Sequence, residues 1–220
     1  MNTTLVKTLV AAAALATTSA YAASISFSDA ASTAVPNWSD TLQVAQFDSS
    51  LGTLNSVTIS FAGSNTGTLA AENLAATGGT MTLEGTATYT LSSAVWNFTG
   101  AAVASRTFAA GAYDGTINYA GTSGATFTNA TGSYSNSLSL SSGLSAFIGT
   151  GNLSFGVNTV GGSSYSGTGA AVAKFDQSAD ARVTVTYNYT AVSGVPEPES
   201  YAMLLAGLAA VGMVKRRRRD

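Results

Sequence analysis

The sequence contains no cysteine and no histidine. The lack of cysteine rules out disulfide bonds, thiol nucleophiles and thiolate metal sites, so a folded domain has to be stabilised by packing alone. The lack of histidine removes the commonest general base, the Ser-His-Asp triad and the imidazole ligands of zinc, copper and iron sites. These two absences exclude more functions than any motif in the chain supports.

Charge is also scarce, because charged side chains make up only 9 % of the chain and six of the nine basic residues lie at its two ends. Residues 23–194 carry three basic and eight acidic residues, which leaves five net negative charges. Such a surface cannot neutralise a phosphate backbone, so we expect no nucleic-acid partner. Attraction of anionic polysaccharide by bulk charge is disfavoured for the same reason. The basic residues are Arg106, Lys174 and Arg182, and the acidic residues are Asp29, Asp40, Asp48, Glu72, Glu84, Asp114, Asp176 and Asp180.

The N-terminus has the features of a secretory signal. One early cation, Lys7, precedes a short apolar stretch at residues 9–16 and the triplet Ala20-Tyr21-Ala22, the small-residue form that signal peptidase accepts. We predict a signal peptide at residues 1–22, with cleavage that leaves Ala23 as the new N-terminus. The alternatives are a buried N-terminal helix or an uncleaved anchor, but the apolar stretch is too short to span a bilayer. We therefore expect an exported protein.

The C-terminus reads VPEPESYAMLLAGLAAVGMVKRRRRD. Its apolar part, residues 201–214, is expected to form a helix about 21 Å long, against about 30 Å of bilayer hydrocarbon. This length is short for a permanent span. The basic run after it would stay cytoplasmic by the positive-inside rule, with the rest of the chain on the outer face of the inner membrane. The run consists of Lys215, Arg216, Arg217, Arg218 and Arg219.

Val195, Pro196, Glu197 and Pro198, followed by an apolar helix and an arginine cluster, resemble the PEP-CTERM sorting signal of exopolysaccharide-producing, mostly Gram-negative bacteria. The resemblance implies that an exosortase, a membrane protease-transpeptidase, cuts near this motif and discards the helix. Residues 195–220 would then be a sorting tail that inserts transiently into the inner membrane before the protein passes to the cell envelope or extracellular matrix. A plain C-terminal membrane anchor is the alternative, and it differs in whether Tyr201 onward stays in the mature protein.

The segment between the two signals reads as β-structure throughout. Residues 54–61, 80–91 and 182–191 alternate apolar and polar side chains with the period of two that half-buried strands show. We predict an antiparallel β-sandwich, jelly-roll-like or Greek key, over residues 23–194, with an open or partly closed barrel as the alternative. Shorter predicted strands are residues 25–27, 42–47, 116–119, 137–140, 152–157 and 171–175, and predicted turn clusters are residues 63–65, 78–79, 121–124 and 161–164.

The stretch QVAQFDSSLGTLNSVTI at residues 43–59 is similar to the opening motif of choice-of-anchor E domains, which are secreted β-rich bacterial domains found with alternative C-terminal sorting signals. The resemblance extends over roughly residues 24–191 and implies a fold and an export route, without an assigned activity. In physical terms, we expect a strand that ends at Phe47, a turn capped by Asp48 with Gly52 as its permissive residue, and a strand that starts at Leu54. The motif therefore predicts a hairpin.

Two sets of carboxylates are candidates for catalysis or metal binding. Glu72 and Glu84 are the only glutamates outside the tail, and a carboxylate pair about 5 to 9.5 Å apart can hydrolyse a glycosidic bond without histidine or cysteine. We expect two solvated carboxylates instead and no enzyme activity. Asp176 and Asp180, in a predicted loop before the last strand, are candidate calcium ligands. Because basic residues flank that loop, an ordinary turn is the preferred interpretation, and no cofactor is expected.

Aromatic residues raise the question of carbohydrate binding, because their rings stack on sugars, but a cysteine-free sandwich also needs them to fill its core. We expect Thr, Ser and Asn at solvent-facing strand positions, where their side chains suit glycosylation or hydrogen bonding to a matrix polymer. The sequence thus predicts a non-enzymatic structural or interaction protein of the exopolysaccharide or biofilm matrix. The alternative, a carbohydrate-binding or calcium-dependent adhesion module, predicts a localised cluster of aromatic or carboxylate side chains. The aromatic candidates are Trp38, Trp96, Tyr113, Tyr119, Tyr134 and Tyr165.

Overall fold

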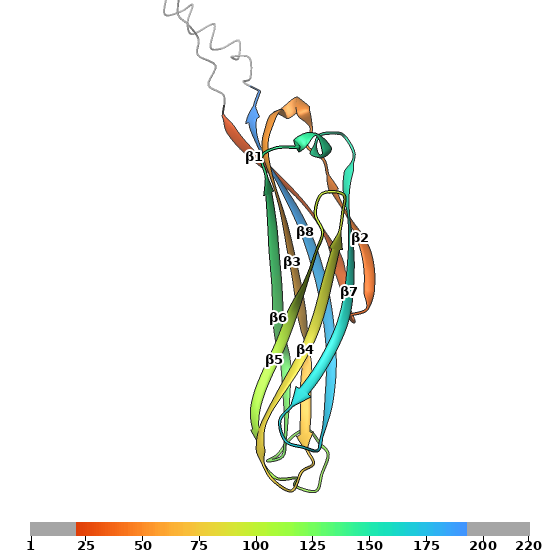
Figure 1. The fold of residues 1–220 in the computed structure, drawn as a ribbon, viewed down its shortest axis with the longest axis vertical. Coiled ribbons are helices and arrows are strands. Elements are labelled where there is room, and N and C mark those ends of the chain that lie inside the picture. Colours follow the sequence, from red (N-terminus) through yellow and green to blue (C-terminus); the bar gives the residue numbers. More distant parts are fainter. Residues whose placement is uncertain (1–20, 193–220) are drawn as a thin grey trace, which may run out of the picture.

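The computed structural model of the protein describes residues 21–192 (Figure 1). Within these residues the chain forms eight strands and two short 3₁₀ turns, at Ser49–Leu51 and Leu144–Phe147. The strands are β1 (Ala22–Ala34), β2 (Trp38–Ala45), β3 (Gly52–Asn73), β4 (Gly79–Ser92), β5 (Phe98–Ala110), β6 (Gly124–Leu140), β7 (Asn152–Ser166) and β8 (Ala171–Ala191).

The strands form two four-stranded antiparallel sheets, which confirms the predicted β-sandwich. Sheet A has the order β1-β8-β3-β6, and sheet B has the order β2-β7-β4-β5. Two sheets that place β1 beside β8, β3 beside β6, β2 beside β7 and β4 beside β5 have the strand order of a jelly roll. Figure 1 shows the result as an elongated sandwich with its strands along the long axis.

The three strongest strand predictions are confirmed, and each strand is longer than its apolar alternation indicated. Val57, Ile59 and Phe61 of β3 are buried between the sheets, as the period of two requires. The same holds for the odd-numbered residues of β4 from Met81 to Leu91, which include Tyr89, and for Val183, Val185 and Tyr187 of β8.

Residues 116–119, predicted as a strand, form part of the loop between β5 and β6 instead. The backbone amides of Asn118 and Tyr119 donate to the Glu72 carboxylate, at 3.3 and 2.7 Å, and are therefore not free for a sheet ladder. Tyr119 also adopts a left-handed conformation with φ of 56°, which a strand does not allow.

Two predicted turn clusters lie inside strands. Residues 63–65 belong to β3, and residues 161–164 belong to β7. Close packing requires glycine at one position in each cluster: a Cβ on Gly63 would lie 2.7 Å from the Tyr89 ring, and one on Gly161 would lie 2.8 Å from Pro36. Glycine in a strand marks such close approaches as well as turns.

The predicted hairpin at residues 47–54 is wrong, because β2 belongs to sheet B and β3 to sheet A. The segment crosses from one sheet to the other. Its expected turn chemistry is present: Asp48 accepts a hydrogen bond from the Ser50 amide at 2.8 Å, and Gly52 has a φ of 150°. These bonds to Ser50 lower the pKa of Asp48 below its usual value.

The interior contains two apolar clusters with a polar layer between them. The larger cluster includes Phe47, Phe61 and Tyr187, and the smaller includes Leu69 and Met81. Between them, Asn65 of β3 donates to the Gly85 carbonyl at 2.9 Å and to the Gln177 side chain at 2.7 Å. Gln177 of β8 in turn donates to the Gly162 carbonyl at 3.2 Å. Side chains of sheet A thus bond both central strands of sheet B.

The two long sides of the sandwich differ. On one side β5 and β6 nearly touch, since a Cβ on Gly132 of β6 would lie 2.3 Å from the backbone of Val103 of β5. On the other side β1 pairs with β8 only from Ala179 to Thr190, and β2 pairs with β7 only from Asn152 to Thr159. The remainder of β7 and β8 therefore forms an open side below the turn that joins β1 to β2.

Candidate functional sites

Tyr21 and Val192, the first and last described residues, lie at the same end of the sandwich. The Ala191 amide donates to the Tyr21 carbonyl at 3.0 Å, and the Val192 amide donates to the Leu51 carbonyl at 3.1 Å. Ala22 and Ala23, at the predicted signal cleavage site, begin β1 at this end (Figure 1). Ala20, the sorting motif and the basic run lie outside the described residues, as does the predicted apolar helix of the tail.

The two glutamates do not form a pair. Glu72 is fully buried on the outer side of sheet A, beneath the loop between β5 and β6. Its carboxylate accepts hydrogen bonds from the amides of Asn118 and Tyr119 and from the Ser123 hydroxyl. Glu84 is exposed on the outer face of sheet B, which points in the opposite direction. Glu72 therefore anchors a loop.

The predicted loop that holds Asp176 and Asp180 is part of strand β8. Residues four apart on one face of a strand are about 13 Å apart, because each pair of residues advances about 6.6 Å. The two carboxylates therefore do not converge on one point, and Asp180 accepts a hydrogen bond from the Ser64 hydroxyl at 2.7 Å. Across residues 21–192, no three acidic side chains gather in a group that could hold a metal ion.

The aromatic candidates are dispersed. Trp38, Trp96 and Tyr134 pack against the larger apolar cluster, where Trp96 lies 4.6 Å from Phe98 between ring centroids. Tyr113 and Tyr119 belong to the loop between β5 and β6, and Tyr165 lies on β7, where its hydroxyl donates to the Ala171 carbonyl at 3.3 Å. Half of the aromatic candidates for sugar binding thus pack against the core.

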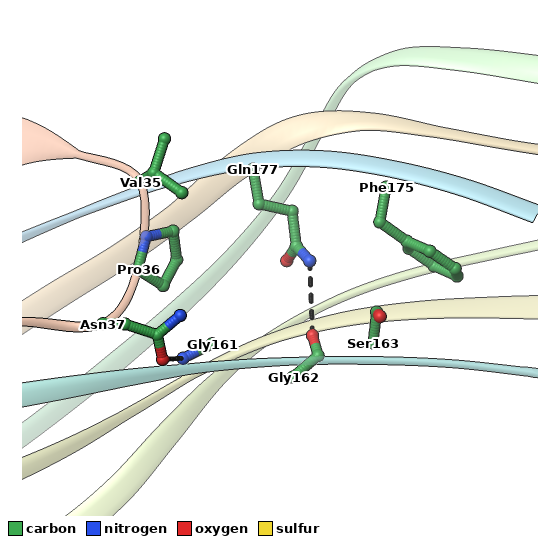
Figure 2. A pocket seen from close by; sticks show the side chains of 8 residues that line it. All are labelled: Val35, Pro36, Asn37, Gly161, Gly162, Ser163, Phe175 and Gln177. Atoms are coloured by element: carbon green, nitrogen blue, oxygen red, sulfur yellow. Dashed lines mark hydrogen bonds between the residues drawn. The ribbon is translucent and has the colours of Figure 1, made fainter.

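A shallow pocket of about 230 Å³ opens on the side of the sandwich that β1 and β2 leave uncovered (Figure 2). Asn37, with a left-handed φ of 95°, lies at one end of the pocket, where its side chain accepts a hydrogen bond from the Gly161 amide at 3.1 Å. Phe175 and Gln177 reach into it from β8. Sequence reasoning missed this pocket; the only local signal is the Pro36-Asn37 turn between two strands.

The outer face of sheet A carries an ordered array of neutral hydroxyl and amide side chains, which we call the hydroxyl face. Its rows run across the strands in register, and Ser26 bonds Thr186 at 2.8 Å while Thr58 bonds Ser139 at 3.1 Å. Neighbouring side chains lie about 4.8 Å apart across the strands and about 6.7 Å apart along them. The hydroxyl face consists of Ser24, Ser26, Ser28, Ser56, Thr58, Ser60, Ser137, Ser139, Thr184, Thr186 and Asn188.

Comparison with known proteins assigns the tail. A family model described as the PEP-CTERM protein-sorting motif matches residues 194–219, which confirms the predicted sorting motif. The motif indicates export through an exosortase system, processing by its membrane transpeptidase, and a place in the envelope or outside the cell. No helix within residues 21–192 is long and apolar enough to cross a membrane.

No curated protein matches the chain. Two viral structures, of the Gt and Gx strains of infectious bursal disease virus, align over 84 % of this chain with 11 % and 14 % identity. Their TM-scores are 0.20 and 0.14, and the chain spans about half the length of each viral chain, 47 % and 48 %.

Proposed function

We propose that the protein is a non-enzymatic structural or interaction component of an exopolysaccharide or biofilm matrix. The observation that carries the proposal is the sorting motif at residues 194–219. On this account signal peptidase removes residues 1–22, and the sandwich spanning residues 23–194 resembles a choice-of-anchor E domain. An exosortase then releases it from the inner membrane of a Gram-negative bacterium into the envelope or matrix.

The dispersion of the candidate residues supports a structural role over the alternative. A carbohydrate-binding or calcium-dependent adhesion module requires a cluster of aromatic or carboxylate side chains. In the described residues, the two glutamates point to opposite sides, the two aspartates are apart on one strand, and Trp38 and Trp96 pack against the core.

The hydroxyl face supports contact with a neutral matrix polymer. Its eleven side chains are Ser, Thr and Asn, which donate and accept hydrogen bonds and carry no charge. Ser is depleted at protein–protein interfaces, which favour aromatic residues, Met and Arg. A polymer of neutral sugars offers the complementary hydroxyl groups.

The test is binding of the exported protein to exopolysaccharide purified from the native organism. Replacing Thr58 and Thr186, adjacent on two central strands, with Glu places two charges in the hydroxyl face. We expect at least tenfold weaker cosedimentation with the polymer. The matched control replaces Thr86 and Thr88 of β4 with Glu, which places the same two charges on the outer face of sheet B. This control should bind the polymer like the wild type. Equal binding by both variants would refute the role of the hydroxyl face.

A further inference from the structure

One edge of β8 has no neighbouring strand. The pairing of β1 with β8 ends at Ala34, opposite Ala179, and β8 extends eight residues further, from Ala171 to Ser178. Over that stretch β8 pairs with β3 on its other side only. Figure 1 shows β1 and β2 alongside only the part of the sandwich nearer Tyr21. An unpaired edge of this kind is a template for another strand.

The hydrogen-bond pattern identifies which groups face the open edge. In an antiparallel strand, the backbone groups of alternate residues point to opposite neighbours. The Ala191 amide bonds Tyr21 on the β1 side, and the Val192 amide bonds Leu51 on the β3 side. The pairing of β8 shifts register once with β1 and once with β3, and in each case the extra residue lies in the partner strand. The backbone groups of β8 therefore keep alternating between its two neighbours along the whole strand. Ala173, Phe175 and Gln177 therefore direct their amides and carbonyls to the open edge.

The corresponding edge of β7 is blocked. The Asn37 amide donates to the Thr159 carbonyl at 2.9 Å, and the Asn37 side chain accepts from the Gly161 amide at 3.1 Å. The asparagine thus occupies the place where a further strand would start. On β8 the Tyr165 hydroxyl reaches the Ala171 carbonyl, and residues 172–178 stay open to a partner.

We propose that a second copy of this chain pairs with this edge of β8 in antiparallel orientation about a two-fold axis at Phe175. Phe175 then lies opposite Phe175 of the second copy, and Ala173 lies opposite its Gln177. Each of these pairs exchanges both backbone hydrogen bonds, about six in all, so that sheet A continues from one copy into the other. Phe175 of the second copy also covers the mouth of the shallow pocket that Phe175 and Gln177 line.

Charge selects this register. Lys174 and Asp176 are both exposed on the outer face of β8, and the proposed register sets Lys174 of each copy opposite Asp176 of the other. Moving the second copy by two residues in one direction sets Lys174 opposite itself, and in the other direction sets Asp176 opposite itself. Opposite charges across a pair of strands stabilise it, and like charges destabilise it.

The first test is a charge exchange. The protein is expressed from the full-length gene, and the oligomeric state of the exported product is measured by sedimentation equilibrium. K174D and D176K should each raise the dimer dissociation constant at least tenfold, because each opposes like charges. The double variant K174D/D176K should restore the wild-type value. R182D, on the same strand and face but beside β1, is the matched control and should change nothing. A monomeric wild type, or a double variant no better than the singles, overturns the proposal.

The second test uses the absence of cysteine from the chain. In F175C the two cysteines lie opposite each other at the axis, at a Cα separation of about 5.5 Å that suits a disulfide. Oxidation should give a covalent dimer, whereas S26C on β1 should stay monomeric. If F175C folds poorly, a mixture of A173C and Q177C should form the same crosslink. Crosslinking by S26C alone would move the interface to β1 and overturn the proposal.

Discussion

At the scale of single residues, Glu72 shows how a group suited to catalysis serves structure. Its carboxylate is fully buried and accepts hydrogen bonds from two backbone amides and the Ser123 hydroxyl. All of these donors come from the loop between β5 and β6. The sequence identified Glu72 as one of two candidate carboxylates, but not its partners, because they lie about fifty residues away in the chain.

Replacing Glu72 with Ala should lower the free energy of unfolding by about 3 kcal/mol, because buried donors lose their acceptor. Amide hydrogen exchange should accelerate at Asn118 and Tyr119. Glu84→Ala is the control, since Glu84 is exposed, and its effect should stay within about 0.5 kcal/mol. Urea denaturation of both variants measures the difference, and equal values would contradict the anchoring role.

Two buried tyrosines make the stability of the fold depend on pH in the alkaline range. Burial raises the pKa of Tyr187 to about 12, and burial together with the nearby Asp180 carboxylate raises the pKa of Tyr89 above its usual value. The unfolded pKa is about 10, so the folded state holds these protons more tightly. Their contribution is therefore complete below pH 10, and that of Tyr187 is lost as the pH rises through 12.

In Tyr187→Phe we expect a smaller loss of stability between pH 10 and 12 than in the wild type. At neutral pH the variant should lose about 1 kcal/mol, because the Tyr187 hydroxyl no longer donates to the Ala45 carbonyl. Thermal unfolding followed by circular dichroism at a series of pH values measures both effects. If the stability of the variant falls between pH 10 and 12 as steeply as that of the wild type, the Tyr187 hydroxyl does not contribute to the pH dependence.

At the scale of strands, the sequence predicted where strands occur better than it predicted where each strand ends. The apolar alternation of residues 54–61 located β3, but the strand continues to Asn73, through Gly63 and Asn65, which read as a turn. Local composition failed there because the need for glycine arises from another strand: the Tyr89 ring of β4 lies where a side chain would be. Residues 176–180 form part of a regular strand instead of the predicted loop, because their polar side chains include the outward-facing Asp176 and Asp180 of that strand.

Gly63→Ala tests this explanation. A Cβ at Gly63 would lie 2.7 Å from the Tyr89 ring, so the ring must shift, and overpacking of this kind costs about 1 to 3 kcal/mol. Gly162→Ala on β7 is the matched control, because its nearest neighbour, the Thr86 Cβ, is 3.8 Å away. Thermal unfolding should separate the two variants, and similar losses would argue that glycine is needed there for backbone freedom.

At the scale of the whole molecule, the fold class followed from sequence, whereas the strand order did not. Segments with alternating apolar and polar residues, between the signal peptide and the sorting tail, predicted a sandwich. The assignment of β2 and β3 to different sheets, however, depends on contacts across the whole jelly roll. That topology brings Tyr21 and Val192, the first and last described residues, to one end of the molecule. The open edge of β8 lies toward the other end of the sandwich, whereas the hydroxyl face begins close to these two residues, at Ser24 and Asn188.

Sorting at the tail is the central claim, and the mass of the C-terminal peptide in the native organism tests it most directly. Top-down mass spectrometry of the membrane and extracellular fractions should find a terminus between Pro196 and Ser200, without residues 201–220 and with added mass from transpeptidation. A terminus intact to Asp220, found only in the membrane fraction, would contradict this account and make the tail an ordinary anchor.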